Sequence, residues 1–302
     1  MMQNLPRILI LLSLPLLMAT CSAPRKPPAS GRLQIFVSIA PQKYFVEQIG
    51  GEYVSVTTLI PSGASPHTFE PKPAQMVLLT AADCYFTIGI ELEKAWLLRL
   101  GTGGTHCLVV ATDSGIPKMM MDDSEEEHEH ALPDEPEHHH HPDAADPHIW
   151  LAPSLVKLQT ATITGALCRL DSTHASYFRK RRMLFDARID SLCIRIAGII
   201  DSCATRREFL VFHPSWGYFA REFSLRQIAI EVEGKEPTLR QMKMILDTAK
   251  SHHITTIFIQ PQFSRKIAES IAQQLDAKVA VADPMAEAWG DNLMTFTEAL
   301  CR

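Results

Sequence analysis

The sequence lacks the motifs that define several common metal sites and membrane spans. Its seven cysteines include no CxxC pair, which argues against the paired-thiolate sites of structural zinc. It has no HExxH motif, the two-histidine helix of many zinc proteases. Beyond residue 20, no apolar run is long enough to cross a bilayer as a helix. We therefore expect the rest of the chain to be a water-soluble domain without either of these metal motifs.

The cysteines are also too scattered to suggest a disulfide framework. Six remain after Cys21, and two of them, Cys193 and Cys203, share one expected helix. Ten residues of helix rise about 15 Å, whereas bridged Cα atoms lie within about 7 Å of each other. We interpret most of the six as small buried apolar residues.

The first 32 residues have the composition of an export signal and a tether. Residues 1–20 contain an apolar core, Ile8 to Ala19, that is too short to span a bilayer. The adjoining LMATC resembles a bacterial lipobox, in which Cys21 is lipidated and becomes the new N-terminus. Residues 21–32 are rich in proline, small and basic residues, as expected of an extended tether. Acyl chains on Cys21 would hold a periplasmic or other extracytoplasmic protein at a membrane surface.

Two blocks of alternating strand and helix patterns predict an α/β fold. Such alternation indicates parallel sheets with helices on both faces. The first block, residues 33–171, and the second, residues 208–302, flank residues 172–207, where apolar residues recur at helical spacing without a proline. At 1.5 Å per residue, this helix would be about 50 Å long and would run along both blocks. We predict two lobes, each with a parallel sheet flanked by helices, joined by one long rigid helix.

The most unusual composition lies in DDSEEEHEHALPDEPEHHHHPDAAD, Asp122 to Asp146. This segment alone contributes −11 to a formal net charge of −5, so the remainder of the chain carries +6. With so little apolar surface to bury, it is expected to be a disordered loop inserted in the first lobe. A solvating insertion is the simpler interpretation, but we favour a flexible metal collector, because imidazoles and carboxylates together capture divalent transition metals. Its histidines are His128, His130, His138, His139, His140 and His141.

Four residues outside this segment have the chemistry of metal ligands and stand in loops or at strand ends. His67 lies in SPHTFEP and His148 in DPHIWLAP, both in the first block. His213 in FLVFHPSW follows a buried strand of the second block, and Asp283 in VAVADPM follows another strand of that block; both precede proline. Taken singly, such residues are more often solvated, capping or turn residues. Because ligands of open parallel sheets bind outside the carboxyl ends of the strands, the four can converge in the crevice between the lobes.

Several motifs in a fixed order give the chain a resemblance to a known family. They are GASPHTFEPKPAQ, the His-rich acidic insertion before DPHIWLAP, the long helix, VFHPSWGYFA, EVEGKEPT, IFIQPQF and VADPMAEAW. From about Leu33 onward, the chain resembles the substrate-binding proteins of bacterial ABC importers for zinc, manganese and iron, of the ZnuA/TroA type. The resemblance implies a non-enzymatic protein with a metal ion between its lobes and a membrane permease as partner. It also implies ligand roles for His67, His148, His213 and Asp283.

The ligand types favour zinc as the cargo over manganese or iron. In the family that this chain resembles, histidine at the third ligand position goes with zinc and a carboxylate there goes with manganese or iron; this chain has His213. Three imidazoles and one carboxylate also suit four-coordinate Zn²⁺, whereas Mn²⁺ prefers more oxygen ligands. Some zinc-binding relatives have an acidic residue before the first ligand, where this chain has Pro66, which makes Asp283 or a water the fourth ligand. Cys301 matches one end of a C-terminal disulfide of some relatives, but the strand TTIFIQP supplies no partner.

Two alternatives belong to other classes of function. A zinc hydrolase would also use three histidines and a water. Against it, Glu70 is three residues from His67 but lies in EPKPAQ, the start of an expected helix, which indicates a structural role. The second alternative is a surface adhesin or metal store without a transporter. We expect no nucleic-acid partner and a monomeric protein.

The other histidines and the large aromatic residues near the motifs are assigned to structure. Histidines at the start or end of helices and strands can contact backbone groups there without binding metal. The residues assigned to structure in this way are His106, His174, His252 and His253, with Trp150, Trp216 and Phe219 as core or cleft-wall residues.

Overall fold

The computed structural model describes residues 31–61, 63–66, 68–102, 106–121, 145–203, 207–231 and 237–301. Within these ranges, the strands form two four-stranded sheets. The strands are β1 (Leu33–Val37), β2 (Val54–Thr58), β3 (Cys84–Thr87), β4 (Leu108–Ala111), β5 (Glu208–Val211), β6 (Arg226–Ala229), β7 (Thr256–Ile259) and β8 (Lys278–Val281). The α-helices are α1 (Ala40–Gly50), α2 (Pro73–Thr80), α3 (Glu91–Thr102), α4 (Pro153–Leu170), α5 (Ala175–Ser202), α6 (Gly217–Glu222), α7 (Leu239–Ser251), α8 (Arg265–Leu275) and α9 (Trp289–Leu300). The short 3₁₀ helices of the described residues are η1 (Gly51–Tyr53), η2 (Ile149–Leu151) and η3 (Ser172–His174).

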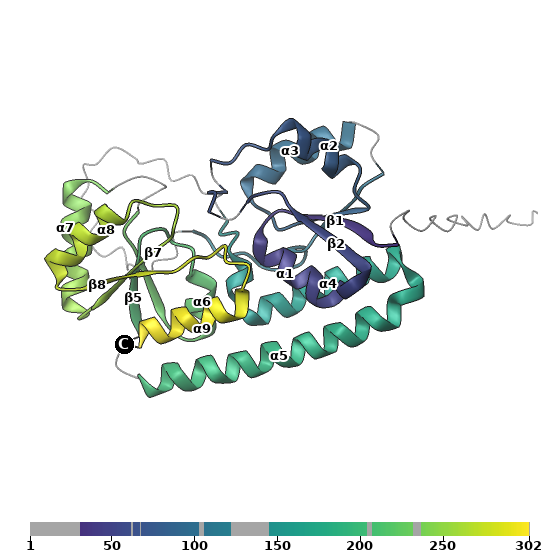
Figure 1. The fold of residues 1–302 in the computed structure, drawn as a ribbon. Coiled ribbons are helices and arrows are strands. Elements are labelled where there is room, and N and C mark those ends of the chain that lie inside the picture. The colour runs from purple at the N-terminus through teal and green to yellow at the C-terminus, as the bar shows by residue number, and fades with distance from the viewer. Residues whose placement is uncertain are drawn as a thin grey trace, which may run out of the picture.

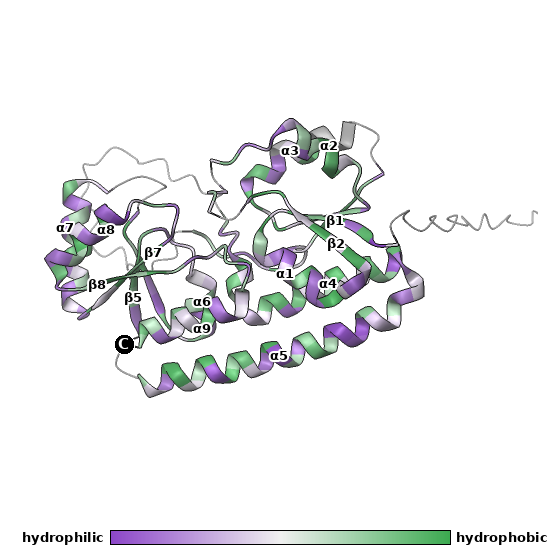
Figure 2. Ribbon diagram, in the orientation of Figure 1, coloured by the Kyte–Doolittle hydropathy of each residue, from purple (hydrophilic) through white to green (hydrophobic). Residues whose placement is uncertain are grey.

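The two sheets repeat one topology. The first lobe has the strand order β2-β1-β3-β4 and the second lobe has β6-β5-β7-β8, with parallel pairing throughout. Strand β3 is buried along its whole length, as expected of a strand covered by helices on both faces. In Figure 2, strands β7 and β8 are mostly green, whereas the helices around the sheets carry both colours. The predicted pair of α/β lobes with parallel sheets is confirmed.

Helix α5 runs along one side of both lobes (Figure 1). It packs against α1 and α4 in the first lobe and against α9 in the second. Its 28 residues correspond to about 42 Å of helix, shorter than the predicted 172–207 element. The difference at the start arises because Asp171 accepts a hydrogen bond from the backbone N–H of His174, which closes the separate turn η3 before the helix begins.

One face of α5 belongs to the core that joins the lobes. Phe178, Phe185, Ile189, Leu192, Ile196 and Ile200 are buried at helical spacing. Leu184, another apolar residue of this helix, is 58% exposed and lies off this face. A single cluster of buried residues continues from the first sheet through α5 to α9, and smaller clusters fill the opposite face of each sheet. The lobes therefore share one hydrophobic core.

A disulfide joins the ends of α5 and α9. Cys203 and Cys301 are 98 residues apart in sequence, and their Cα atoms lie 5.5 Å apart. The interpretation of the cysteines as unpaired apolar residues is therefore wrong for these two, because packing of α5 on α9 brings the helix ends together. Among the described cysteines, Cys84 and Cys107 form no disulfide and are buried, as predicted, whereas Cys168 and Cys193 form none and are half-buried.

The described helices include none that is both long enough and apolar enough to span a bilayer. The proposed signal and tether, residues 1–20 and most of 21–32 with Cys21, lie outside the described residues.

Candidate metal centre

The structure brings His148 and His213 together from different lobes. His148 immediately precedes η2 in the first lobe, and His213 lies two residues beyond the carboxyl end of β5 in the second. The centroids of their rings are 5.5 Å apart, and both residues are buried. This contact places the two histidines between the lobes, at the strand end where ligands of parallel sheets bind.

A neighbouring carboxylate fixes the ring of His148. Asp146 Oδ1 lies 2.6 Å from His148 Nδ1 and also accepts the backbone N–H of His148 at 2.9 Å. Asp146 is itself buried, so this contact is shielded from water. In the tautomer that carries the proton on Nδ1, the ring donates to Asp146 and its Nε2 presents a lone pair. This is the arrangement in which a carboxylate orients a histidine that binds metal.

His213 has the same kind of support from its own lobe. Glu231 Oε2 lies 3.1 Å from His213 Nδ1. The side chain of Gln260, one residue beyond β7, accepts from the His213 backbone N–H at 3.3 Å and donates to its carbonyl at 2.8 Å. The backbone and the ring of His213 are thus both held in place, with Nε2 as the ring nitrogen suited to a metal.

The spacing of the two rings fits zinc. Two imidazoles bound to one Zn²⁺ at Zn–N distances of about 2.0–2.1 Å, near the tetrahedral angle, place their ring centroids roughly 5 Å apart. The observed separation of 5.5 Å agrees with this arrangement. Nitrogen donors of this kind suit zinc better than manganese, which prefers oxygen.

Asp283 lies two residues beyond the end of β8, in a segment that is tied to the first lobe. Its Oδ1 accepts the backbone N–H of Met285 at 2.9 Å. Trp150, two residues after His148, donates its indole N–H to the carbonyl of Pro284 at 2.7 Å. Burial raises the pKa of the Asp283 carboxyl above its usual value, partly offset by the hydrogen bond from Met285. A cation beside this half-buried carboxylate would stabilise its charged form.

The complete four-ligand set is not assembled by the described part of the chain. Across those residues, no three His, Cys, Asp or Glu side chains are grouped so that they could hold a metal ion, so Asp283 does not join the histidine pair in such a group. His67 lies outside the described residues, between Pro66 and Thr68. His128, His130, His138, His139, His140 and His141 lie outside them as well.

Sequence reasoning missed the two carboxylates that orient the histidines. Val211 and Ala229, the last residues of β5 and β6, pair with each other, so the residues two positions beyond each strand, His213 and Glu231, are placed side by side. The register of these strands would have revealed Glu231. For His148, the signal is local, since Asp146 stands two residues before it across a proline, where an aspartate readily bonds to the following backbone.

The assignment of other histidines to structure agrees with their contacts. His174 stacks on Tyr53 with ring centroids 3.7 Å apart, and its Nδ1 lies 2.6 Å from Asp171 Oδ2. His252 directly follows α7 and forms an ion pair with Glu208. Trp150, Trp216 and Phe219 are core residues, each at most 1% exposed.

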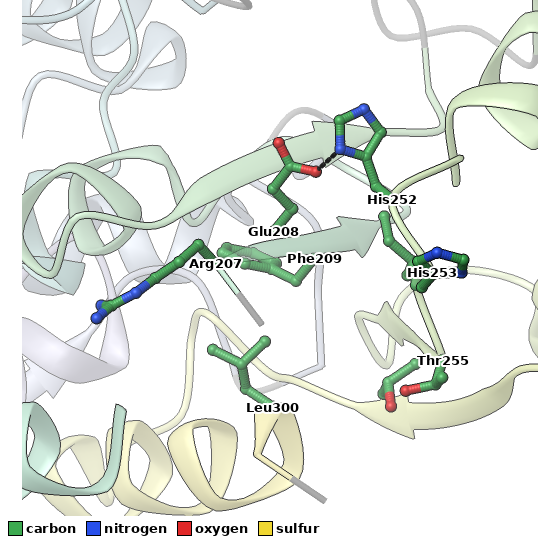
Figure 3. A pocket seen from close by; sticks show the side chains of 9 residues that line it. Arg207, Glu208, Phe209, His252, His253, Thr255 and Leu300 are labelled. Carbon is green, nitrogen blue, oxygen red and sulfur yellow. Dashed lines mark ion pairs between the residues drawn. The ribbon is translucent and has the colours of Figure 1, made fainter. Parts of the chain in front are cut away.

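A pocket of about 260 Å³ lies at the opposite, amino end of the second sheet. Its lining includes Arg207, Glu208, His252, His253 and Leu300, and Figure 3 shows the ion pair between Glu208 and His252 at its wall. Glu208 also lies 3.5 Å from Arg226 of the neighbouring strand. The charged groups of this pocket pair with one another at the amino end of the sheet, away from His148 and His213.

Comparison with known proteins agrees with the geometry of the interlobe site. A family model described as the periplasmic component A of zinc-uptake complexes, ZnuA, matches residues 35–301. The chain belongs to this family.

Individual ZnuA proteins resemble the chain over most of its length. A crystal structure of a zinc-bound ZnuA deletion mutant has a TM-score of 0.79 and 37% identity, and the match covers 89% of this chain and 97% of that one. The high-affinity zinc uptake system protein ZnuA of Bacillus subtilis (strain 168) is 29% identical over 258 residues, 84% of this chain and 79% of the relative. A manganese-bound periplasmic metal-binding protein of Candidatus Liberibacter asiaticus, at 17% identity and a TM-score of 0.74, covers 89% of this chain and 100% of that one and shares the fold.

Proposed function

We propose that this protein captures Zn²⁺ between its two lobes on the extracytoplasmic side of a membrane and delivers it to an ABC-type permease. The observation that carries the proposal is the buried pair His148 and His213, each with Nδ1 beside a carboxylate. Two such imidazoles from different lobes make a site that closes around a metal ion. Membership of the ZnuA family supports zinc as the ion and uptake as the purpose.

The proposed ligand set is His67, His148, His213 and Asp283. Three neutral imidazoles and one carboxylate would leave a net charge of +1 with Zn²⁺, which suits an ion that must be held and later released. Asp283 supports this set by its position, because its half-buried carboxylate lies two residues beyond the end of β8, as His213 does beyond β5. His67 would complete the site from the loop between β2 and α2.

Metal titration tests the zinc assignment directly. Protein purified without added metal and then stripped with a chelator is expected to bind one Zn²⁺ tightly and Mn²⁺ much more weakly, because the histidine pair supplies nitrogen ligands. Isothermal titration with each ion, with a competing chelator for zinc, measures this preference. Equal or tighter binding of Mn²⁺ would favour the alternative, a manganese or iron receptor of the same fold.

We propose that the site binds zinc and does not catalyse hydrolysis. A zinc hydrolase needs a general base within hydrogen-bond reach of the metal-bound water. Here the carboxylates beside His148 and His213 contact the Nδ1 atoms, where they orient the rings. Turnover of ester or peptide substrates by the zinc-loaded protein at a rate above that of free zinc would contradict this.

We further propose that residues 122–144 collect zinc for the tight site. The ends of this segment are held side by side, since Met120 and Ala145 form an antiparallel bridge. Replacing residues 122–144 with a short Gly-Ser linker should therefore keep one tight zinc site and remove additional weak sites from the titration. Stopped-flow capture of zinc at low concentration should be slower in this variant. Loss of the tight site would mean that a ligand lies in the deleted segment.

Membrane attachment through a lipid on Cys21 belongs to the same proposal. Two or more acyl chains suffice for stable anchoring at a membrane surface. Mass spectrometry of the mature N-terminus tests it, and an unmodified Cys21 would refute it.

A further inference from the structure

The segment that carries His148 is held by a tyrosine from the other lobe. We define the stem as the two pieces of chain that flank residues 122–144, namely Met119–Met121 and Ala145–Asp146. The stem is closed by the bridge between Met120 and Ala145 and by a hydrogen bond of 2.8 Å from the Asp146 N–H to the Met119 carbonyl. It leads directly into His148.

The hydroxyl of Tyr218 joins both pieces of the stem. Tyr218 lies in α6 of the second lobe and is 1% exposed. Its oxygen accepts the backbone N–H of Met119 at 2.8 Å, and its proton is donated to the carbonyl of Asp146 at 2.9 Å. Since the same Asp146 orients His148 through its carboxylate, the tyrosine acts on the residue that fixes the imidazole.

The start of α6 lies close enough to the stem for this contact to be specific. A Cβ added to Gly217 would lie 3.4 Å from Asp146 Oδ2 and 3.8 Å from Met119 Cε. The residue before Gly217 is held as well, because the backbone N–H of Trp216 donates to Gln227 Oε1 at 2.6 Å. Tyr218 is therefore presented to the stem by a fixed piece of backbone.

This contact connects the two histidines through a short path. His213 lies in the connection from β5 to α6, five residues before Tyr218 of α6, and His148 stands two residues after Asp146. One hydroxyl thus fixes the position of the His148 segment relative to the His213 segment across the lobe boundary. We propose that Tyr218 is a positioning residue that sets the separation of His148 and His213 for zinc. The inference rests on the proposed zinc function of these histidines.

Replacing Tyr218 with phenylalanine tests the role, with Tyr85→Phe as the matched control. Tyr85 is also a fully buried tyrosine, but its hydroxyl bonds to Ser38 at 2.7 Å, within the first lobe. Tyr218→Phe loses two buried hydrogen bonds and Tyr85→Phe loses one, so both variants are expected to unfold at a lower temperature without metal. Tyr218→Phe alone should weaken zinc binding, by about 10-fold, the lower end of what loss of an outer partner of a metal ligand costs.

Cobalt provides a readout that a purely structural role would not change. The visible absorption of Co²⁺ bound in place of zinc depends on ligand geometry, so the bands of Tyr218→Phe should differ from those of the wild type in position or intensity. The bands of Tyr85→Phe should match the wild type. Zinc affinity and cobalt bands of Tyr218→Phe that equal those of the wild type would overturn the inference.

A double-mutant cycle tests whether Tyr218 acts on His148 through Asp146. Asp146→Asn removes the charged partner of His148, so Tyr218→Phe should weaken zinc binding less in that background than in the wild type. Losses of zinc affinity that are fully additive in the double variant would show that Tyr218 does not act through Asp146. Failure of the wild type itself to bind zinc would instead reject the proposed function, and the two failures are therefore distinguishable.

Discussion

Replacing His213 with alanine is expected to lower the affinity for zinc by more than about 100-fold, since changes in the outer partners of metal ligands alone cost about 10–100-fold. The variant loses the nitrogen donor of the second lobe and leaves the half-buried Glu231 without the imidazole that lies 3.1 Å away. His213→Gln separates these effects, because its amide can still donate to Glu231 while lacking an imidazole nitrogen. Competition titration with a chelator measures zinc affinity, and thermal unfolding without metal measures stability.

A histidine elsewhere in the second lobe supplies the control. His253 is exposed and has φ of 52°, a left-handed conformation that asparagine tolerates. His253→Asn should leave zinc affinity unchanged. If His213→Gln bound zinc as tightly as the wild type, His213 would be a structural residue at the end of β5, and the ligand set would need another member.

The same position also tests the choice between zinc and manganese. His213→Glu supplies an oxygen ligand, but it places a second carboxylate beside Glu231, and two like charges at this distance repel each other. The informative variant is therefore His213→Glu combined with Glu231→Gln. It should shift the preference from zinc toward manganese in paired titrations, relative to Glu231→Gln alone.

Removing the disulfide between Cys203 and Cys301 is expected to lower the free energy of unfolding by about 2–5 kcal/mol. The bridge closes a loop of 98 residues, for which the chain-entropy model gives a contribution near the upper end, about 4–5 kcal/mol. Chemical denaturation of the double variant Cys203→Ala/Cys301→Ala measures the loss. The bridge lies at the amino end of the second sheet, so zinc affinity should be retained below the unfolding transition.

The free cysteines provide a matched comparison for this experiment. Cys193 is half-buried in the same helix as the residues leading to Cys203, and it forms no disulfide. Cys193→Ala should change the stability by no more than about 1 kcal/mol, the typical effect of a single substitution. Reduction of the wild type should reproduce the loss seen in the double variant. An unchanged unfolding midpoint in both cases would contradict a stabilising role for the bridge.

The fold was predictable from the sequence because its signals are local. Buried strands such as β3 and β7 are short apolar runs, and the burial of Phe185, Ile189 and Leu192 follows the period of a helix. The placement of His213 and Asp283 two residues beyond their strands also follows from local pattern. Convergence of strand ends at one edge of a parallel sheet then indicates where ligands bind.

The parts that could not be predicted depend on contacts between distant elements. Glu231 reaches His213 through the register of β5 and β6, and Tyr218 reaches Asp146 across the lobe boundary. The disulfide depends on where α5 and α9 end, not on the spacing of cysteines in sequence. The full ligand set stays a prediction, because His67 lies outside the described residues.

The position of the disulfide also decides how the protein would carry a mechanical load. Cys203 precedes β5 and Cys301 follows α9, so the bridge connects the entrance of the second lobe to its exit. Tension applied to the two ends of the chain would pass from α5 through the sulfur atoms and bypass β5, β6, β7 and β8. While the bridge is intact, such a pull could lengthen the first lobe and α5, but the backbone between Cys203 and Cys301 would bear no force.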